Sequence, residues 1–431
     1  LQLKYSALPY PLIFHGGQVV YSSTEERVRL DDLYTDPTAS PIIRVSGEIG
    51  PDDSAIPLGF NSTLMAIGLS IEEGPDSRGL ALDEQKLVSS LPPDPKSFVE
   101  KMNLSGQVTG SLNVVHRYGT NSNGEGTQIV EYDARGKLKN GGLDFGLNAE
   151  ELFADFELHG GIEPGSGHTF SGQLQNLSLN FNKFLATVPE DRTLDFTYGV
   201  THPRLTPQGA ESYELPTSWV LDRIPSDRSR LFQAEIGPAS IYGGTLDGFF
   251  FVDLGDLDGS YAGEILVDSL QLAEGSANLF GRPDIAGSTS IDTRFAGIVG
   301  VKGSTIGDGS FRISNGNLAR IPLIAGALIN PFEGLNRRNN KIKSAEGAFT
   351  IANSAFEFKG MGSLKLDSPT GAIFGKGKFL FDTSIDLIFE PQTLGGTPLI
   401  SDIANRLLRF RVVGTIEDPE ITVRKVKQQE L

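Results

Sequence analysis

Histidine is the residue type with the widest choice of chemistry in this chain, because the sequence contains no cysteine. The absence of cysteine excludes disulfides, thiolate metal sites and cysteine nucleophiles. None of the five histidines stands with a carboxylate or a second histidine in a recognised metal-ligand spacing. We interpret them as surface or turn residues and expect no metal and no other cofactor. The five are His15, His116, His159, His168 and His202.

Three short motifs imitate catalytic or ligand-binding sequences, and each lacks the context that its chemistry needs. Ser166 lies between two glycines, but a nucleophile elbow needs a strand before the serine and a helix after it. The acidic stretch 253–264 has glycine at the third position of a calcium loop, so a hairpin turn rich in Asp and Gly explains it better. The glycines of 297–303 precede another strand pattern, not the helix of a phosphate loop. The sequence therefore predicts no catalytic site and a protein that is not an enzyme.

Charge and hydropathy exclude two further classes of protein. The chain carries 37 Lys and Arg against 54 Asp and Glu, a net charge of −17, and a field of that sign repels the phosphates of nucleic acids. No run of about 18 apolar residues occurs, so no segment is expected to cross a bilayer as a helix. The first residue is Leu1. We interpret the chain as a processed or truncated piece, with any signal or membrane anchor upstream.

A short module recurs along the chain: a glycine, one further residue, an apolar residue, and then alternation of polar and apolar residues. Copies occupy 106–108, 172–174, 263–265, 309–313, 347–351 and 377–381. Glycine makes up 51 of 431 residues, well above its usual share of about 7%. Because side chains alternate between the two faces of a strand, each copy predicts a strand with one apolar and one wet face. Frequent turn signals between the copies predict a mostly β, antiparallel architecture.

Helical patterns are few and short. We expect short helices over 95–102, 149–156, 320–335 and 398–408, of which the last two would pack on a sheet or cap one end. The stretch 200–216 holds three prolines and little periodicity, which marks a domain boundary near 205–235. We therefore divide the chain into an N-terminal Gly-rich β region, 1–205, and a C-terminal β domain, 235–425.

Three motifs in the C-terminal half, taken in order, resemble the AsmA-like family. The first runs from Gly307 to Leu318 and leads into the apolar stretch 321–324. The second is 345–353, followed by 374–377, and the third is the ending 410–419, which closes on Gly-Thr-Ile-Glu-Asp-Pro. The resemblance implies an elongated, curved antiparallel sheet that forms an apolar groove, with a few short capping helices. It also implies a place in the periplasm of a double-membraned bacterium, with an inner-membrane anchor in the full-length protein.

The same resemblance implies conduction of phospholipid, or of another acyl-chain lipid, along the groove between membranes, in support of outer-membrane homeostasis. The implied partners are the membranes at its two ends, reached through segments outside this sequence, and envelope proteins; nucleic acid is not among them. Burying a CH₂ group is worth about 0.8 kcal/mol, so exposing a lipid with two long chains to water costs on the order of 20 kcal/mol. A continuous apolar lining would remove most of that barrier.

The groove residues that we predict all lie in the C-terminal half. They are Leu246, Phe249, Phe251, Val267, Phe311, Ile313, Phe349, Ile351, Phe379, Phe381, Leu387 and Phe389. One alternative is that these side chains pack together in a closed core, as in a non-enzymatic envelope scaffold or assembly protein. A carbohydrate-active β protein is less favoured, because the chain has one tryptophan, Trp219, and no evident pair of acids. The run 249–251 places aromatics on both faces of one strand, so we expect a cover on both sides there.

Overall fold

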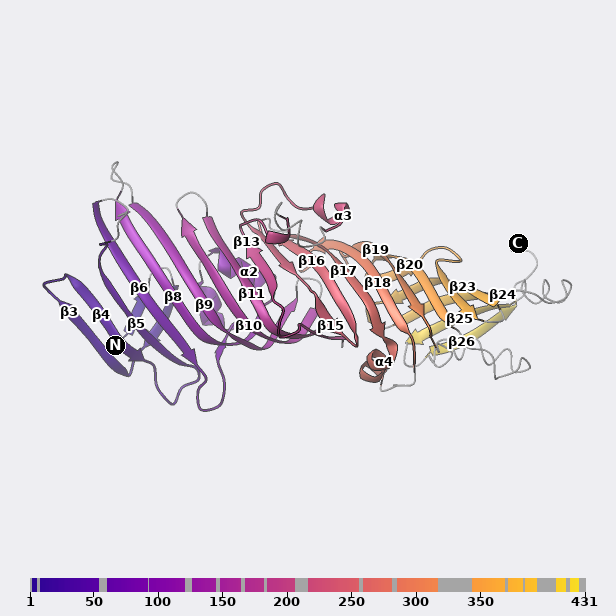
Figure 1. The fold of residues 1–431 in the computed structure, drawn as a ribbon, viewed down its shortest axis with the longest axis horizontal. Coiled ribbons are helices and arrows are strands. Elements are labelled where there is room, and N and C mark those ends of the chain that lie inside the picture. Colours follow the sequence, from indigo (N-terminus) through magenta and orange to yellow (C-terminus); the bar gives the residue numbers. More distant parts are fainter. Residues whose placement is uncertain are drawn as a thin grey trace.

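The computed structural model shows a mostly β protein with a few short helices, as the sequence predicts (Figure 1). It describes the whole chain except residues 1, 6–7, 54–59, 92, 121–125, 145–147, 164–166, 182–183, 206–215, 256–258, 281–284, 317–342, 369–370, 383, 394–407, 416–418 and 426–431. One hairpin stands apart, and it consists of β1 (Gln2–Tyr5) and β2 (Leu8–Ile13). All other described strands belong to one antiparallel sheet.

The first strands of the sheet are β3 (Gly16–Ser22), β4 (Arg27–Tyr34), β5 (Ile42–Pro51), β6 (Phe60–Glu72), β7 (Leu80–Ala81), β8 (Ser105–Thr120), β9 (Gly126–Asp144), β10 (Asn148–Glu163), β11 (Gly167–Phe181), β12 (Phe184–Thr187) and β13 (Leu194–Tyr198). The later strands are β14 (Leu231–Glu235), β15 (Ala239–Ile241), β16 (Gly244–Asp253), β17 (Ser260–Gln271), β18 (Ser288–Ile298), β19 (Ile306–Ser314), β20 (Ser344–Ala352), β21 (Ala355–Phe358), β22 (Leu364–Ser368), β23 (Gly371–Leu380), β24 (Ser384–Thr393), β25 (Leu408–Thr415) and β26 (Pro419–Lys425). The described helices are α1 (Gln85–Ser90), α2 (Pro93–Lys101), α3 (Ser218–Leu221), α4 (Leu272–Phe280) and a 3₁₀ turn, Pro203–Leu205.

Strands that follow each other in the chain are neighbours in the sheet almost throughout. The exceptions arise at short strands, where the pairing skips one or two strands: β6 pairs with β8, β11 with β13, β12 with β15, β14 with β16, β20 with β22 and β21 with β23. The pairing of β13 with β14 carries the sheet without a break across the boundary expected near 205–235, so the division into two domains stays a prediction. Because each strand adds to the far side of the previous one, β3 and β26 lie at opposite ends of a long body (Figure 1).

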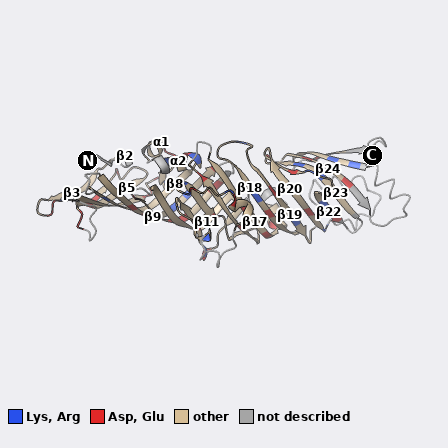
Figure 2. Ribbon diagram, turned by 90° about the horizontal axis from the view of Figure 1, so that it is seen from above, with Lys and Arg blue, Asp and Glu red and all other residues tan. Residues whose placement is uncertain are grey.

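The sheet curves toward one of its faces. In the view of Figure 1, α2 lies behind the long strands β8 to β11, and β25 and β26 pass behind β20 to β23 on the same side. Figure 2, turned by 90°, shows β2, α1 and α2 above the sheet at one end and β24 raised above it at the other. The C-terminal strands therefore bend over the face on which α1 and α2 lie.

The helix predictions have different outcomes. The helix over 95–102 is confirmed as α2, which begins at Pro93, where proline fits because the first turn needs no backbone N–H. The helix over 149–156 is wrong, because these residues belong to β10 and pair with β9 and β11. In that segment Leu152 and Ala154 are buried while Phe153 is exposed, so pairing on both sides overrides the helical propensity. The other two expected helices, 320–335 and 398–408, lie outside the described residues, except for Leu408, where β25 begins.

In four of the recurring modules the glycine lies under an aromatic ring of the neighbouring strand; these glycines are Gly172, Gly263, Gly309 and Gly347. Two modules face each other in β19 and β20, where Gly309 pairs with Phe349 and Phe311 pairs with Gly347. A Cβ atom added to Gly347 would lie 2.5 Å from the ring of Phe311, and one added to Gly309 would lie 2.6 Å from the ring of Phe349. Each ring therefore occupies the space that any other residue would need for its side chain.

The same arrangement recurs elsewhere in the sheet. Between β17 and β18, Tyr261 pairs with Gly297 and Gly263 pairs with Phe295. An added Cβ on Gly297 would lie 2.4 Å from the Tyr261 hydroxyl oxygen, and one on Gly263 would lie 2.9 Å from the Phe295 ring. Glycine normally weakens a strand, but an aromatic side chain that covers it from the next strand restores packing. In β19 and β20 the two modules therefore act as a pair, each supplying the ring that covers the glycine of the other.

We expect Gly347→Ala to lower the free energy of unfolding by about 1–3 kcal/mol, the usual cost of forcing extra atoms into a packed site. The reason is that the new methyl group would overlap the Phe311 ring. Denaturant unfolding measures the cost, and the double variant Gly347→Ala/Phe311→Ala should cost less than the two single variants together. Gly68→Ala in β6 is the control, because its nearest new neighbour would be the Asn113 side chain at 3.2 Å. Strictly additive costs would contradict the pairing.

Candidate functional site

The two faces of the sheet differ in chemistry along the whole length of the described strands. In β9, Ala134 and Leu138 point to one face and Arg135 and Lys137 to the other. The face of Ala134 carries the large apolar clusters and is the side on which α2 packs. We call it the apolar face, and we call the opposite one the polar face.

One row of paired residues crosses the apolar face from β4 to β26, and we call it the central row. In order, it consists of Leu33, Val45, Leu69, Leu112, Ala134, Leu158, Gly172, Phe196, Ala234, Phe250, Gly263, Phe295, Gly307, Ile351, Phe356, Phe379, Ile385, Gly414 and Pro419. Each member is the register partner of the next one across a strand boundary. Every member is apolar or glycine, so no polar side chain interrupts the row.

The adjacent row, one residue along on each strand, lies on the polar face and carries charges of both signs. Arg294 of β18 faces Asp308 of β19, with an ion-pair distance of 2.9 Å. Lys378 of β23 faces Glu357 of β21, at 2.7 Å. Exposed pairs of this kind contribute only about 0–1 kcal/mol each to stability. Their main consequence is that the polar face is well suited to water while the apolar face is not.

Burial of the apolar face changes along the sheet. Phe389, Phe410 and Val412 are almost completely buried at the C-terminal end, where the sheet curves over this face. Leu112 and Leu158 of the central row, in β8 and β10, are only half-buried. The apolar face is therefore packed closed at its C-terminal end and partly open to solvent between β6 and β10.

Helix α2 covers the apolar face between these two parts. The Phe98 ring lies 6.1 Å from the Phe170 ring in β11 and 5.0 Å from the Phe232 ring in β14, measured between centroids. Met102, just after the helix, is buried in the same cluster. The Lys101 ammonium group donates a hydrogen bond to the backbone carbonyl of Leu254 at 2.9 Å. The sequence predicts this helix but carries no signal for the place where it packs.

All but two of the predicted groove residues lie on the apolar face. They are Leu246, Val267, Phe311, Ile313, Phe349, Ile351, Phe379, Phe381, Leu387 and Phe389. They belong to two clusters that share Leu143, Ile265 and Leu272 as neighbours, so they form one surface. The sequence prediction missed the N-terminal part of that surface, although the same period-two alternation in 43–49 and 65–71 could have revealed it.

The assignment of Phe249 and Phe251 to the groove is wrong. Both rings point to the polar face, where they are almost completely buried against Val220 and Trp219. Residues 200–205 and 216–230, which include α3, form the cover, and we call them the outer cap. The expected cover on both sides of 249–251 is confirmed, because Phe250 lies on the opposite face and packs there against the large apolar cluster that includes Phe232.

Buried polar groups lie beneath the outer cap, and no pattern in the sequence predicts their burial. The Arg204 guanidinium donates to the Asp247 carboxylate at 3.1 Å, and only 3% of Arg204 is exposed. His202 is fully buried with its Nε2 3.0 Å from the Asp195 carbonyl oxygen, and burial lowers its pKa. Glu235 accepts a hydrogen bond from the Asp195 N–H at 3.4 Å, and burial raises its pKa to about 7. The contacts of Arg204 and His202 anchor the outer cap to the polar face, whereas Glu235 is bonded to the neighbouring strand β13.

The interpretation of the histidines as surface or turn residues holds for His15 and His159, which are exposed. It is wrong for His202 and for His168, both of which are buried. His168 lies at the rim of the apolar face, with its Nε2 2.5 Å from the Tyr132 hydroxyl oxygen. Within the described part of the chain, no group of three His, Asp or Glu side chains is placed to hold a metal ion.

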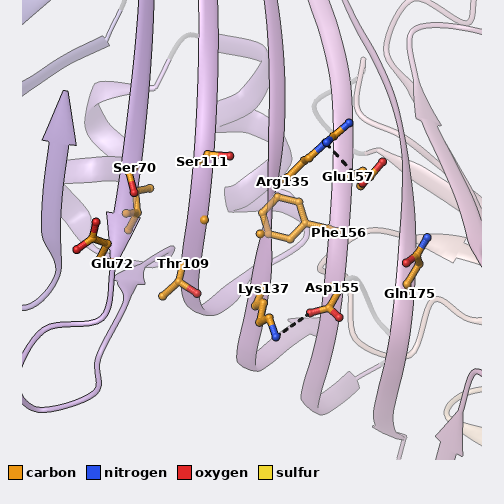
Figure 3. A pocket seen from close by; sticks show the side chains of 13 residues that line it. Ser70, Glu72, Thr109, Ser111, Arg135, Lys137, Asp155, Phe156, Glu157 and Gln175 are labelled. Atoms are coloured by element: carbon orange, nitrogen blue, oxygen red, sulfur yellow. Dashed lines mark ion pairs between the residues drawn. The ribbon is translucent and has the colours of Figure 1, made fainter. Parts of the chain in front are cut away.

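Two hollows open on the polar face, and the charged lining of the first consists largely of ion pairs. Figure 3 shows the first, a hollow of about 560 Å³ in which Arg135 lies 3.5 Å from Glu157 and Lys137 lies 3.7 Å from Asp155. The second, of about 810 Å³, lies over β16 to β20 and includes the half-exposed Leu266. Because the charges of the first hollow are paired across strands, they stabilise strand register and provide no obvious nucleophile or base.

The short motifs that imitate a calcium loop and a phosphate loop contain turns in the structure. The stretch 297–303 forms the end of β18 and the turn to β19, with Gly300 and Gly303 at positive φ. The Asp253 carboxylate accepts a hydrogen bond from the Gly255 N–H at 2.8 Å, the geometry of an Asx turn. Residues 256–258 and Ser166 lie outside the described residues.

Comparison with known proteins identifies no relative of this chain. The chain matches no family model, no curated protein and no solved structure. Among the described helices, none has the length and apolar character needed to cross a bilayer.

Replacing Glu235 by Gln should remove a pH dependence of stability. The pKa of Glu235 is raised from 4.5 to about 7 in the folded protein, and below pH 4.5 the carboxyl group is protonated in both states. Between these values the unfolded chain loses its proton first, so stability falls as the pH rises. The loss is complete above pH 7 and amounts to about 3 kcal/mol. Glu235→Gln carries no charge, so its advantage over the wild type should be absent at pH 4 and full at pH 8.

Thermal unfolding between pH 4 and pH 8 measures this difference. The Asp195, Arg204 and Asp247 charges near Glu235 are present in both proteins, so they cancel in the comparison. Glu131→Gln, at an exposed position in β9, is the control and should follow the wild type at every pH. The interpretation fails if Glu235→Gln shows the same pH profile as the wild type.

Proposed function

We propose that this chain is an AsmA-like periplasmic protein that holds phospholipid or another acyl-chain lipid on its apolar face and conducts it along the sheet between membranes. The observation that carries the proposal is the central row, an apolar track without a polar interruption from β4 to β26. An acyl chain that moves along such a track exchanges one apolar neighbour for another at each strand. No step of that movement places a fatty chain against a charged side chain of the row.

The energetics of the half-buried part of the apolar face favour an acyl chain there. Leu69, Leu112 and Leu158 of the central row are partly exposed to water. Each Å² of apolar surface left in water costs about 25 cal/mol, and each CH₂ group withdrawn from water is worth about 0.8 kcal/mol. A fatty chain lying across β6 to β10 would reduce both costs at once. The polar face, with its ion pairs, would keep the loaded protein in solution.

The places of the family-like motifs support the same proposal. Gly307 to Ser314 forms most of β19, 345–352 lies in β20, and the ending 410–419 spans β25 and the start of β26. The motif glycines Gly309 and Gly347 are the ones that receive aromatic rings. The resemblance therefore rests on residues that shape the apolar face, and not on scattered surface positions.

A second candidate function, a non-enzymatic envelope scaffold, is favoured by one observation. Phe389, Phe410 and Val412 are packed against protein at the C-terminal end, as in the core of a closed sandwich. A scaffold of this kind would hold no lipid anywhere on the apolar face. The two candidates therefore differ most clearly in the part between β6 and β10.

Photocrosslinking from the apolar face tests the choice between these functions. A photoreactive residue at Leu112 or Phe381 should label acyl chains when the protein is expressed in a double-membraned bacterium. The same residue at Ser111 or Lys378, each on the polar face of the same segment, is the matched control and should label none. Mass spectrometry of the purified protein identifies the adducts. Equal labelling on both faces, or none on either, would speak for the scaffold.

A charge placed in the central row should block the track. We expect Leu112→Glu to reduce bound lipid, and lipid transfer between vesicles, by about tenfold, which corresponds to about 1.4 kcal/mol. The reason is that burying a carboxylate beneath a fatty chain costs much of its hydration free energy. Ser111→Glu adds the same charge to the polar face of β8 and should leave binding and transfer unchanged. Far-UV circular dichroism confirms that both variants are folded. Unchanged transfer by a folded Leu112→Glu variant would overturn the role of the central row.

A further inference from the structure

Strand β3 ends the sheet at its N-terminal side. It pairs with β4 from Gly16 to Ser22, which is its one pairing among the described strands, and β26 lies at the opposite end of the molecule (Figure 1). A bulge interrupts the register between Gly16 and Gln18, where Gly17 has a positive φ. From Gln18 to Ser22 the other edge of the backbone is open to pairing with a further strand. Such an edge is a template for association unless the sequence protects it.

The side chains of β3 provide none of the usual protection. The strand contains neither proline nor a charged residue, and Val19, Val20 and Tyr21 are 49%, 46% and 65% exposed. The strand at the other end of the sheet, β26, differs: it begins with Pro419 and ends with two basic residues, Arg424 and Lys425. Prolines and charges on an edge strand prevent pairing with other chains. The molecule thus has one protected end and one that is ready to associate.

The open edge is also the end of the apolar face. Val19 pairs with Leu30 and Tyr21 pairs with Val28, and both partners belong to the N-terminal apolar cluster or pack against it. Val19 and Tyr21 are exposed because no strand lies beyond them. A strand added here would bury both side chains and would lengthen the apolar face by its own inward residues.

We propose that the occupant of this edge is β3 of a second copy of the chain, paired antiparallel about a two-fold axis. An interface of this symmetry must complement itself, and an uncharged strand does so without like charges in the contact. With the axis at Val19, Gln18 of one copy lies opposite Val20 of the other. Asp31 in β4 of the first copy lies next to Gln18, and Arg29 in β4 of the second copy lies next to Val20. The two β4 side chains that flank this row therefore carry opposite charges. A head-to-tail contact with β26 is disfavoured by the proline and charges of that strand.

The consequence is a continuous sheet of two copies in which the apolar faces meet at the axis. This association does not depend on whether the apolar face holds lipid. A lipid-free dimer and a lipid-bound dimer would use the same edge, so failure of one proposal does not decide the other.

Sedimentation velocity with wild-type protein and edge variants tests the association. The ionic strength should be about 0.15 M, where the Debye length is about 8 Å, because the net charge of −17 on each copy opposes contact at low salt. We expect a concentration-dependent dimer in the wild type and a dissociation constant at least tenfold higher for Val20→Lys. Val301→Lys is the matched control, since Val301 is 46% exposed like Val20 but lies in a turn, and it should dimerise as the wild type does.

Cysteine cross-linking locates the contact independently of any effect of lysine on folding. The chain has no cysteine, so Val20→Cys introduces a single thiol at the edge and Val301→Cys a single thiol elsewhere. A short bis-maleimide should join two copies of the first variant and not of the second. A wild type that stays monomeric up to its solubility limit, a dimer that Val20→Lys leaves intact, or equal cross-linking from both positions would each overturn the proposal.

Discussion

Strand register is the constraint on which the rest of the molecule depends. Because side chains alternate along a strand, a slip of one residue would move a charged row onto the apolar face and the central row into water. The paired modules oppose such a slip. Phe311 fits over Gly347 and Phe349 over Gly309 in one register only, since any residue with a Cβ atom would meet the ring. Glycine, which weakens a strand by itself, here specifies how strands align.

A long apolar face on a single sheet creates a second requirement, which is cover. The chain meets it in different ways along its length. At the C-terminal end the sheet curves over itself and buries Phe410 and Val412. In the middle, α2 inserts Phe98 between Phe170 and Phe232. Between β6 and β10 the leucines of the central row remain partly exposed. A bound lipid would therefore bury the most apolar surface in this part of the sheet.

The sequence predicts the strands and their apolar sides well, because alternation is a local signal. It predicts Phe379 and Ile351 on the apolar face for that reason. It does not predict the central row, since the row exists only once register is set between strands that turns of unknown length connect. Phe249 and Phe251 were misplaced for a related reason. Alternation predicts that Phe249 and Phe251 lie on the opposite face of the strand from Phe250. It does not predict which of these two faces is the apolar face, and the outer cap that packs over β16 and β17 decides this.

The sequence also does not predict which polar side chains are buried. Glu235 and His202 look like ordinary surface residues in the chain, and they become buried because the outer cap folds over the polar face. The helix expected over 149–156 failed because propensity is local while β10 is fixed from both sides by β9 and β11. In each of these cases the deciding contact joins segments that are distant in the sequence or on separate strands.

The central row changes character where α2 crosses it, and this change bears on how the proposed conduction could work. From β4 to β10 its large members are aliphatic, and Leu112 and Leu158 are half-buried. From β13 onward they are mostly phenylalanines, such as Phe295 and Phe379, many of them held over glycines. Flexible aliphatic side chains suit a mobile fatty chain, whereas rings locked by register leave little room for one. A lipid could therefore enter the open aliphatic part without rearrangement, but passage through the aromatic part would require the C-terminal strands to move away from the face that they now cover.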